Sequence, residues 1–442
     1  MKRFILEQSD NEFYTSHSGL ALVGLCINRY SGLPLQISKK MKGNDVISHT
    51  DIVRSFLGLL CLGKSDYEAI SAMRDDTYFQ QSLGIKNVPS AERLRQRLDE
   101  HAESLLPIIK DCSVAMLKKG GVHFTALDTG HVPLDADVFP MDNSNTKKEG
   151  VSRTYHNYNG YAPIASYLGL EGWCLEVELR PGSQHSQEGF VPYLNRVIER
   201  ARTLTSKKLL VRLDSAHDAL ETRLALRDHN KVSYIIKWNP RRENTNDLCA
   251  RAFAEGAVTE PRAGKRVALL TIRKNQEHEG QHYGFTKVVR VTERITNKHG
   301  QLLIVPDMTV EGWWTNLDLP AQKIISLYEN HGLSEQFHSE FKSDLDLERL
   351  PSGKFRTNEL IMALGAFAYN ILRLIGQLGL LGEHSPVRHP AKRRRIKTVI
   401  QELIYRAARL ISSGNRLRLR FSCHCPAFAA FADVYNRLLP TI

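Results

Sequence analysis

Residues 208–214, Lys-Leu-Leu-Val-Arg-Leu-Asp, form a short apolar run that ends on a carboxylate and precedes a helical stretch from about residue 218. This pattern predicts a buried strand of an α/β sheet, with Asp214 at its carboxyl end. A carboxylate in that position lies where α/β sheets bind their ligands. From this stretch alone, an equally good interpretation is that Asp214 or Ser215 only caps the following helix, since both residue types are preferred caps.

A second run of the same kind, Val122-His-Phe-Thr-Ala-Leu-Asp128, opens a predicted strand at 122–132. Between the two runs we expect a hairpin at 160–180 and a helix at about 187–204. A β-branched and aromatic run at 232–238 predicts a further strand. This order of strand, hairpin, helix and strand predicts an α/β protein with an RNase H-like (retroviral integrase-like) catalytic core.

Residues 328–342 place four chemically useful side chains at helical spacing. On one helix at about 100° per residue, Tyr328, His331, Glu335 and Lys342 would fall within roughly 60° of one another. A stripe of this kind is most often a solvated helix face, so it gains meaning only together with the two upstream aspartates.

An Asp, an Asp and a Glu that meet at the edge of a sheet have a plain chemical use. Asp128, Asp214 and Glu335 could hold two divalent metal ions about 4 Å apart and promote in-line attack on a phosphodiester. Oxygen ligands favour Mg²⁺, with Mn²⁺ as a substitute.

At these positions the chain resembles the DDE transposases of bacterial insertion sequences, whose signature is Tyr-x2-Arg-x3-Glu-x6-Lys. Residues 127–135 resemble the strand of the family's first Asp, and residues 210–218 resemble that of the second. The resemblance runs from about residue 120 to 380. One position departs from the signature, because its Arg is His331 here, which loses a fixed charge and a bidentate fork.

The resemblance implies that Asp128, Asp214 and Glu335 ligate two Mg²⁺ ions. It also implies that Tyr328, His331 and Lys342 contact the DNA of the transferred end. Such an enzyme binds the inverted repeats of its element and target double-stranded DNA, acts as a homodimer in the DNA complex, and catalyses cleavage and strand transfer. Two alternatives stay open, a nuclease of the same fold and a transposase-derived DNA-binding protein without transposition activity.

Composition agrees with a polyanionic partner. The chain has 442 residues, a formal net charge of +12 and a pI of about 9.3. Seven scattered cysteines favour a reducing compartment over a disulfide framework. The apolar stretch 360–381 contains Asn370, Arg373 and Gln377, so we interpret it as a buried helix and expect no membrane contact. The expected location is the bacterial cytoplasm, at the nucleoid.

The N-terminal part is helical from residue 50 to about 107, after a possible strand at 20–26. A helix that starts at Ser90 and carries Arg93 and Arg97 is typical of a helix-turn-helix DNA reader. A plain helical bundle with solvated arginines explains the same pattern equally well.

The remaining segments are assigned by composition and charge. The polar loop at 144–153 carries Lys147 and Lys148, which are either solvated or in contact with DNA. Alternating runs between 240 and 320 predict a β-rich insertion. The basic tail holds Lys392, Arg393, Arg394 and Arg395, and an alternating strand at 416–420 suited to phosphate contact or to dimerisation.

The expected parts are an N-terminal helical DNA-binding region at 1–119, the first part of the core at 120–239, the insertion at 240–320, the Glu helix with its packing helix at 321–385, and the basic C-terminal region at 386–442.

Overall fold

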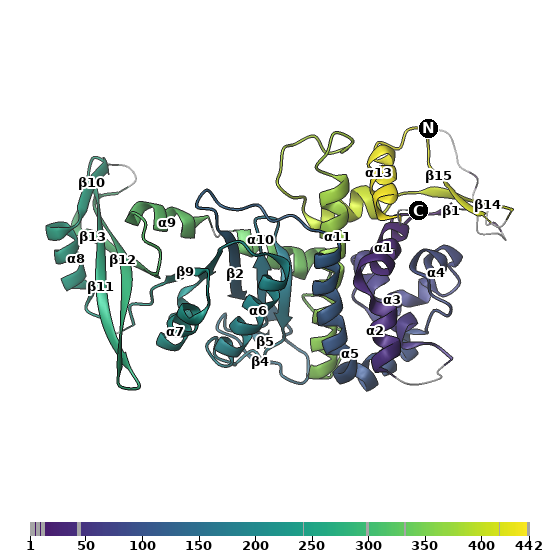
Figure 1. Ribbon diagram of the computed structural model, residues 1–442, viewed down its shortest axis with the longest axis horizontal. Helices are drawn as coiled ribbons and strands as arrows, with labels where there is room; N and C mark the ends of the chain where they lie inside the picture. The colour runs from purple at the N-terminus through teal and green to yellow at the C-terminus, as the bar shows by residue number, and fades with distance from the viewer. Residues whose placement is uncertain are drawn as a thin grey trace.

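The structure is a computed structural model, and it describes residues 5, 9, 14–41, 46–241, 243–297, 300–330, 333–414 and 416–439. Figure 1 shows an elongated molecule. A β-rich lobe forms one end, an α/β core occupies the middle, and a helical region forms the other end. The C-terminal segment returns to lie beside the N-terminal helices.

A nine-stranded mixed sheet spans the core and the β-rich lobe, in the order β10-β11-β12-β13-β9-β8-β2-β6-β7. Strands β2, β8 and β9 are parallel, whereas β6 and β7 form an antiparallel hairpin on β2. The core strands are β2 (Val132–Val138), β6 (Ile164–Leu168), β7 (Trp173–Glu178), β8 (Leu209–Leu213) and β9 (Val232–Lys237). The carboxyl ends of β2 and β8 therefore meet at the same edge of the sheet.

The strand expected at 122–132 is wrong in its position. Residues 122–131 are not strand, and β2 begins only at Val132. The cause is a turn at Asp128-Thr-Gly130, in which the amide of Gly130 donates to the carbonyl of Leu127 and the amide of Leu127 donates to that of His131. Gly130 has a φ of +77°, which a residue with a side chain rarely adopts.

The predicted hairpin, helix and later strands are present. Helix α6 (Phe190–Leu204) packs with its apolar side inward, and strands β8 and β9 match the predicted runs. The β-rich lobe consists of α8 (Thr245–Glu255), β10 (Ala257–Arg262), β11 (Lys265–His278), β12 (Gln281–Thr296) and β13 (Leu302–Thr315). It joins the core because Trp313–Thr315 of β13 pair with β9.

The helical side of the core is organised around α11 (Phe355–Gly379), along which α5 (Ala91–Lys119) lies (Figure 1). Among the described residues, α11 is the one helix long and apolar enough to cross a membrane, and its most apolar window is wholly buried inside the protein. The interpretation of this stretch as a buried helix is confirmed.

The N-terminal region contains α1 (Leu20–Cys26), η1 (Ile27–Ser31), α2 (Leu33–Lys40), α3 (His49–Cys61), η2 (Tyr67–Met73) and α4 (Thr77–Leu83). The expected strand at 20–26 is therefore a helix, since periodicity does not separate the two for a short, fully buried apolar run. Smaller pieces complete this region and the core edge, namely β1 (Tyr14–Thr15), β3 (Met141–Asp142), β4 (Ser152–Arg153), β5 (Asn159–Tyr161), η3 (Ser215–His217) and α7 (Leu220–Asp228).

The end of the chain packs on the core. It consists of α12 (Ile396–Val399), η5 (Ile400–Ile404), β14 (Ala408–Ser413), β15 (Arg416–Arg420) and α13 (Phe428–Leu438). Helix α13 contacts both α1 and α11, and the strand order of the small sheet is β1-β14-β15.

Candidate active site

Two aspartates lie side by side at the carboxyl edge of the sheet. In the parallel pairing of β2 with β8, Asp135 is level with Arg212 and Ala136 with Leu213. One further step places Asp137, the last residue but one of β2, level with Asp214, which follows β8 directly. Because side chains alternate along a strand, Asp135, Arg212, Asp137 and Asp214 all project from one face.

The Asp135–Arg212 pair fixes this part of the sheet. The Arg212 guanidinium donates to both carboxylate oxygens of Asp135 at 2.7 Å, and both side chains are buried. It also donates to the carbonyl of Leu327 at 2.9 Å. Leu327 lies near the end of α9 (Ala321–Glu329), so one buried cation joins two core strands to the helix that leads to Glu335.

Negative charge is concentrated at the aspartate pair. Burial and the neighbouring carboxylates of Asp214 and Glu335 raise the pKa of Asp137 to about 8. Burial also raises the pKa of Asp214, although its carboxylate caps the η3 turn by accepting from the amide of Ala216. Asp214 therefore serves both as a cap and as a member of the acidic pair, and the two interpretations of this residue do not exclude each other.

Glu335 lies on α10 (Leu333–Ser339), in the first turn of the helix, and its side chain is exposed. Contacts between aromatic side chains hold α10 against the core. Phe337 packs against Tyr167 of β6 at 4.9 Å between centroids, and His338 stacks on Phe139 at 4.5 Å. A side chain at Gly172, in the β6–β7 turn, would lie 2.3 Å from the Phe337 ring, so the close approach of α10 requires glycine there.

Asp128 does not belong to this group, which corrects the sequence-based assignment. It lies in the turn before β2, at the opposite end of the strand from Asp137. Its side chain is 64% exposed and forms an ion pair with Lys323 of α9, whose hydrogen bond lowers the pKa of Asp128. The register of β2 with β8 brings Asp137, and not Asp128, beside Asp214.

The single helix expected at 328–342 is also wrong. Helix α9 ends at Glu329, α10 begins at Leu333, and residues 340–344 form the π-helical turn η4 (Glu340–Asp344). Tyr328 therefore lies on a different helix from Glu335 and Lys342, which share the continuous segment α10–η4, and the spacing does not define one stripe on a single helix. His331 lies outside the described residues.

Tyr328 and Lys342 take different roles in the structure. Burial and then the Asp214 and Asp137 carboxylates raise the pKa of Tyr328, and its ring lies 6.1 Å from that of Trp313 between centroids. The ammonium of Lys342 donates to the carbonyl of Pro140 at 2.8 Å and pairs with Glu348 at 2.9 Å. Lys342 thus ties η4 to the segment that leaves β2.

Two residues of the site were missed from the sequence, Asp137 and Tyr155. Asp137 stands two residues after Asp135 in Pro133-Leu-Asp-Ala-Asp137, a signal for two carboxylates on one strand face. Tyr155 lies between β4 and β5, is 62% exposed, and has its pKa raised by burial and then by the Asp137 and Asp214 carboxylates. Its ring lies 4.4 Å from that of His156.

The donor set fits a hard divalent cation. Asp137, Asp214 and Glu335 offer carboxylate oxygens, which Mg²⁺ and Mn²⁺ prefer, and a bound cation would favour the ionised form of Asp137, whose pKa is raised by burial and by the neighbouring carboxylates. In the described part of the chain, no three His, Cys, Asp or Glu side chains form a preformed metal cluster.

Three arginines of the basic run at 392–395 contact other parts of the protein. Arg393 forms an ion pair with buried Glu340 and donates to Gln336, and Arg395 forms a bidentate pair with Asp344. Arg394 donates to the backbone carbonyls of Leu380 and Val387 at 2.9 and 2.8 Å. Of the four, Lys392 alone forms no side-chain hydrogen bond or ion pair with the described residues, and it is exposed. Arg393, Arg394 and Arg395 therefore have internal partners, and their contact with DNA stays a prediction.

Of the other residues predicted to contact DNA, some have internal partners and some are exposed. Arg97 is buried and bonds to His49 at 3.0 Å, and Lys148 donates to the carbonyl of Leu350, so both have internal partners. Arg93 and Lys147 are exposed. The helix that carries Arg93 runs for 29 residues against α11, longer than the recognition helix expected there.

Comparison with known proteins finds a protein family whose model matches almost the whole chain. A family model described as Transposase DDE domain group 1 matches residues 7–441. The cryo-EM structure of a piggyBac transposase synaptic complex with hairpin DNA is similar, with a TM-score of 0.44 and 11% sequence identity over 88% of this chain and 80% of that chain. A search of curated proteins found no match.

Proposed function

The chain belongs to the transposase DDE domain group 1 family, and from this premise we propose that it is the DNA transposase of a bacterial insertion sequence. The observation that supports this most is the adjacency of Asp137 and Asp214 on one sheet edge, with Glu335 close enough to raise the pKa of Asp137. Residues 120–239 and 321–385 would form an RNase H-like core on either side of the β-rich insertion.

In this proposal Asp137, Asp214 and Glu335 hold two Mg²⁺ ions. Bound there, Mg²⁺ would supply activation of the attacking hydroxyl and stabilisation of the leaving oxygen. The Asp135–Arg212 pair keeps the two strand ends level. His217 lies under Asp214, stacked on Phe190 at 3.9 Å, and burial lowers its pKa to about 3, so it stays neutral and adds no charge to the acidic edge.

The substrate is double-stranded DNA, both the inverted repeats of the element and the target. Tyr328 and Tyr155 border the carboxylates and would contact the DNA strand at the scissile phosphate. We further propose a homodimer in the DNA complex, a cytoplasmic location at the nucleoid, and membership of the branch with the Tyr-Arg-Glu-Lys signature. Lys342 of that signature would act through the β2 exit loop rather than on DNA.

The test compares carboxylate variants of nearly constant shape. Asp137→Asn, Asp214→Asn and Glu335→Gln should each abolish Mg²⁺-dependent cleavage of a labelled element end while end binding persists. Asp128→Asn is the matched control and should cleave normally, because Asp128 lies at the other end of β2. Loss of cleavage in Asp128→Asn with full activity in Asp137→Asn would return the assignment to Asp128. Cleavage without any strand transfer would indicate a nuclease instead.

A further inference from the structure

The β14–β15 hairpin gathers four arginines on one face. In the antiparallel register, Arg409 is opposite Arg420, Ile411 is opposite Arg418, and Ser413 is opposite Arg416. Opposite residues project from the same face, as do alternate residues along a strand. Arg409, Arg416, Arg418 and Arg420 therefore form a single arginine face, and all four side chains are exposed.

The charge of this face is not compensated within the described residues. None of the four arginines forms an ion pair or a side-chain hydrogen bond with those residues, whereas Arg406 just before the hairpin pairs with Glu402. No Asp or Glu occurs between residues 403 and 432. Arg409 and Arg420 stand directly opposite each other, and like charges in that position destabilise a sheet. Folding alone gives no reason for this arrangement, whereas an anion bound across the face would relieve the repulsion.

The opposite face of the hairpin anchors it to the protein. Leu410 and Leu419 pack against the main core, and Phe421 lies 4.9 Å from Phe431 of α13 between ring centroids. On the outer edge, β1 pairs with β14 through Thr15 and Ala408. The arginine face is therefore carried by a fixed element and is not part of a free tail.

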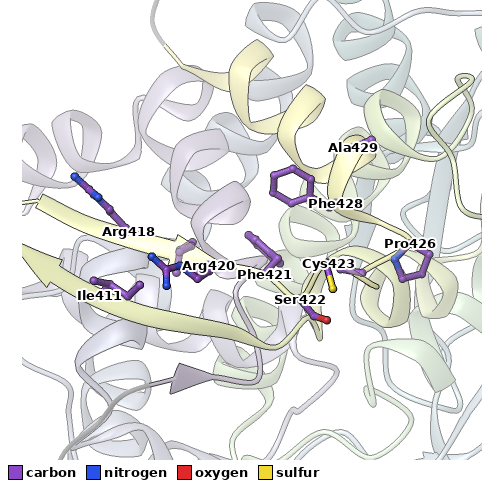
Figure 2. A pocket seen from close by; sticks show the side chains of 11 residues that line it. Ile411, Arg418, Arg420, Phe421, Ser422, Cys423, Pro426, Phe428 and Ala429 are labelled. Carbon is purple, nitrogen blue, oxygen red and sulfur yellow. The ribbon is translucent and has the colours of Figure 1, made fainter.

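The arginine face also has a shape suited to a rigid polyanion. Alternate residues of β15 lie about 6.7 Å apart, so Arg416 to Arg420 span about 13 Å. Figure 2 shows Arg418 and Arg420 on the hairpin beside a hollow of about 530 Å³ that reaches Phe421 and Phe428. About 13 Å of duplex DNA carries roughly eight phosphate charges on its two strands, enough to engage all four arginines.

We infer that the arginine face of the β14–β15 hairpin binds the phosphate backbone of duplex DNA at a surface separate from the carboxylate site. The inference rests on the proposed function, which supplies the duplex. The hairpin lies in the helical end of the molecule, and the core sheet separates it from the β-rich lobe (Figure 1). The contact therefore involves DNA that flanks the scissile phosphate. A second copy presenting the same face would be repelled, which disfavours a symmetric protein contact through these arginines.

The test measures affinity of the full-length protein for a labelled duplex long enough to span the molecule, between about 50 and 200 mM salt. The variant is Arg416→Gln, Arg418→Gln and Arg420→Gln together. Each lost phosphate contact reduces the slope of log K against log salt by about 0.9, so the slope should become shallower by about two to three. Cleavage at saturating DNA should persist, because the carboxylates are untouched.

The matched control removes the same charge from exposed arginines that already have acidic partners, Arg251→Gln, Arg356→Gln and Arg437→Gln. Its salt slope should equal that of the wild type. Equal changes in both triple variants would overturn the inference, because net charge alone would explain them. An unchanged slope with a lost dimer would also overturn it and would make the hairpin a protein interface. Failure of the wild type to bind any DNA would instead overturn the proposed function.

Discussion

Arg212 shows how one buried side chain can support a site that it does not enter. Its guanidinium is 1% exposed and satisfies both oxygens of Asp135 and the carbonyl of Leu327. The pair lies two residues before the Asp137–Asp214 level on each strand, so any shift of β2 against β8 would separate the two carboxylates.

Arg212→Ala should lower the free energy of unfolding by about 3–5 kcal/mol, because it removes the buried cation that balances the charge of the Asp135 carboxylate. Arg212→Lys keeps the charge but loses the bidentate fork, so it should fold and yet cleave more slowly than the wild type. Denaturant unfolding and end cleavage measure the two effects. Arg251→Ala, at an exposed pair with Glu255, is the control and should change neither. A wild-type cleavage rate in Arg212→Lys would contradict the positioning role.

Tyr155 offers a separate test of substrate contact. Its exposed ring contributes little to the core, so Tyr155→Ala should leave thermal unfolding unchanged. If the ring stacks on a base at the cleaved end, its loss should weaken end binding or cleavage by about 1–3 kcal/mol, or roughly 5- to 150-fold. Tyr155→Phe keeps the ring and should retain most activity. Equal activity in the Ala and Phe variants at the wild-type level would exclude a contact with DNA.

At the scale of elements, arginines of α11 and of the segment that follows it hold α10 and η4 in place. Glu340 is buried and bonds to both Arg373 and Arg393, and Asp344 bonds to Arg395. Lys342 adds a contact with Pro140 at the exit of β2. The arginines that follow α11 therefore set the position of the helix that carries Glu335.

Arg393→Ala should slow cleavage and lower the free energy of unfolding by about 1.5–3 kcal/mol, since Glu340 loses one of two charged hydrogen bonds. Lys392→Ala, next to it in the chain, removes an exposed charge and should leave both quantities unchanged. End cleavage and chemical denaturation are measured side by side. Wild-type behaviour of Arg393→Ala with weaker DNA binding would assign this arginine to DNA after all.

At the scale of the whole molecule, the C-terminal segment belongs to the core. Ile396, Val399, Leu403, Phe431 and Val434 are all buried. Each buried apolar side chain of this kind stabilises the fold by about 1.5–3 kcal/mol, and the net stability of a domain is only about 5–15 kcal/mol.

Removal of residues 388–442 should therefore unfold or aggregate the protein rather than only weaken its DNA binding. Thermal unfolding followed by circular dichroism measures this, with the Arg416, Arg418 and Arg420 triple variant as a control that should melt at or slightly above the wild-type temperature, because it removes like-charge repulsion. A truncated chain with a normal melting temperature would show that the tail packs more loosely than its burial indicates.

Part of the fold follows from local sequence. The strand at 209–213, the hairpin on β2, the helix at 190–204 and the buried helix at 355–379 were all predicted within a few residues, because hydrophobic periodicity and turn residues act over short distances. Asp214 was placed correctly at a strand end for the same reason.

Two assignments required the tertiary structure. Asp137 replaces Asp128 because the register between β2 and β8, two strands about 75 residues apart in the chain, decides which carboxylate lies beside Asp214. The run at 393–395 looked like a DNA contact but pairs with Glu340 and Asp344, which are remote in sequence.

The sequence by itself determined the type and order of most core elements and the chemistry available to them, since both depend on neighbouring residues. Only the tertiary structure decided which acids meet and which arginines stay unpaired. Those outcomes depend on packing between distant segments. The sequence alone does not distinguish a charged residue that is paired in the fold from one that is not. The four arginines of the β14–β15 hairpin remain without one among the described residues, whereas Arg393 and Arg395 do not.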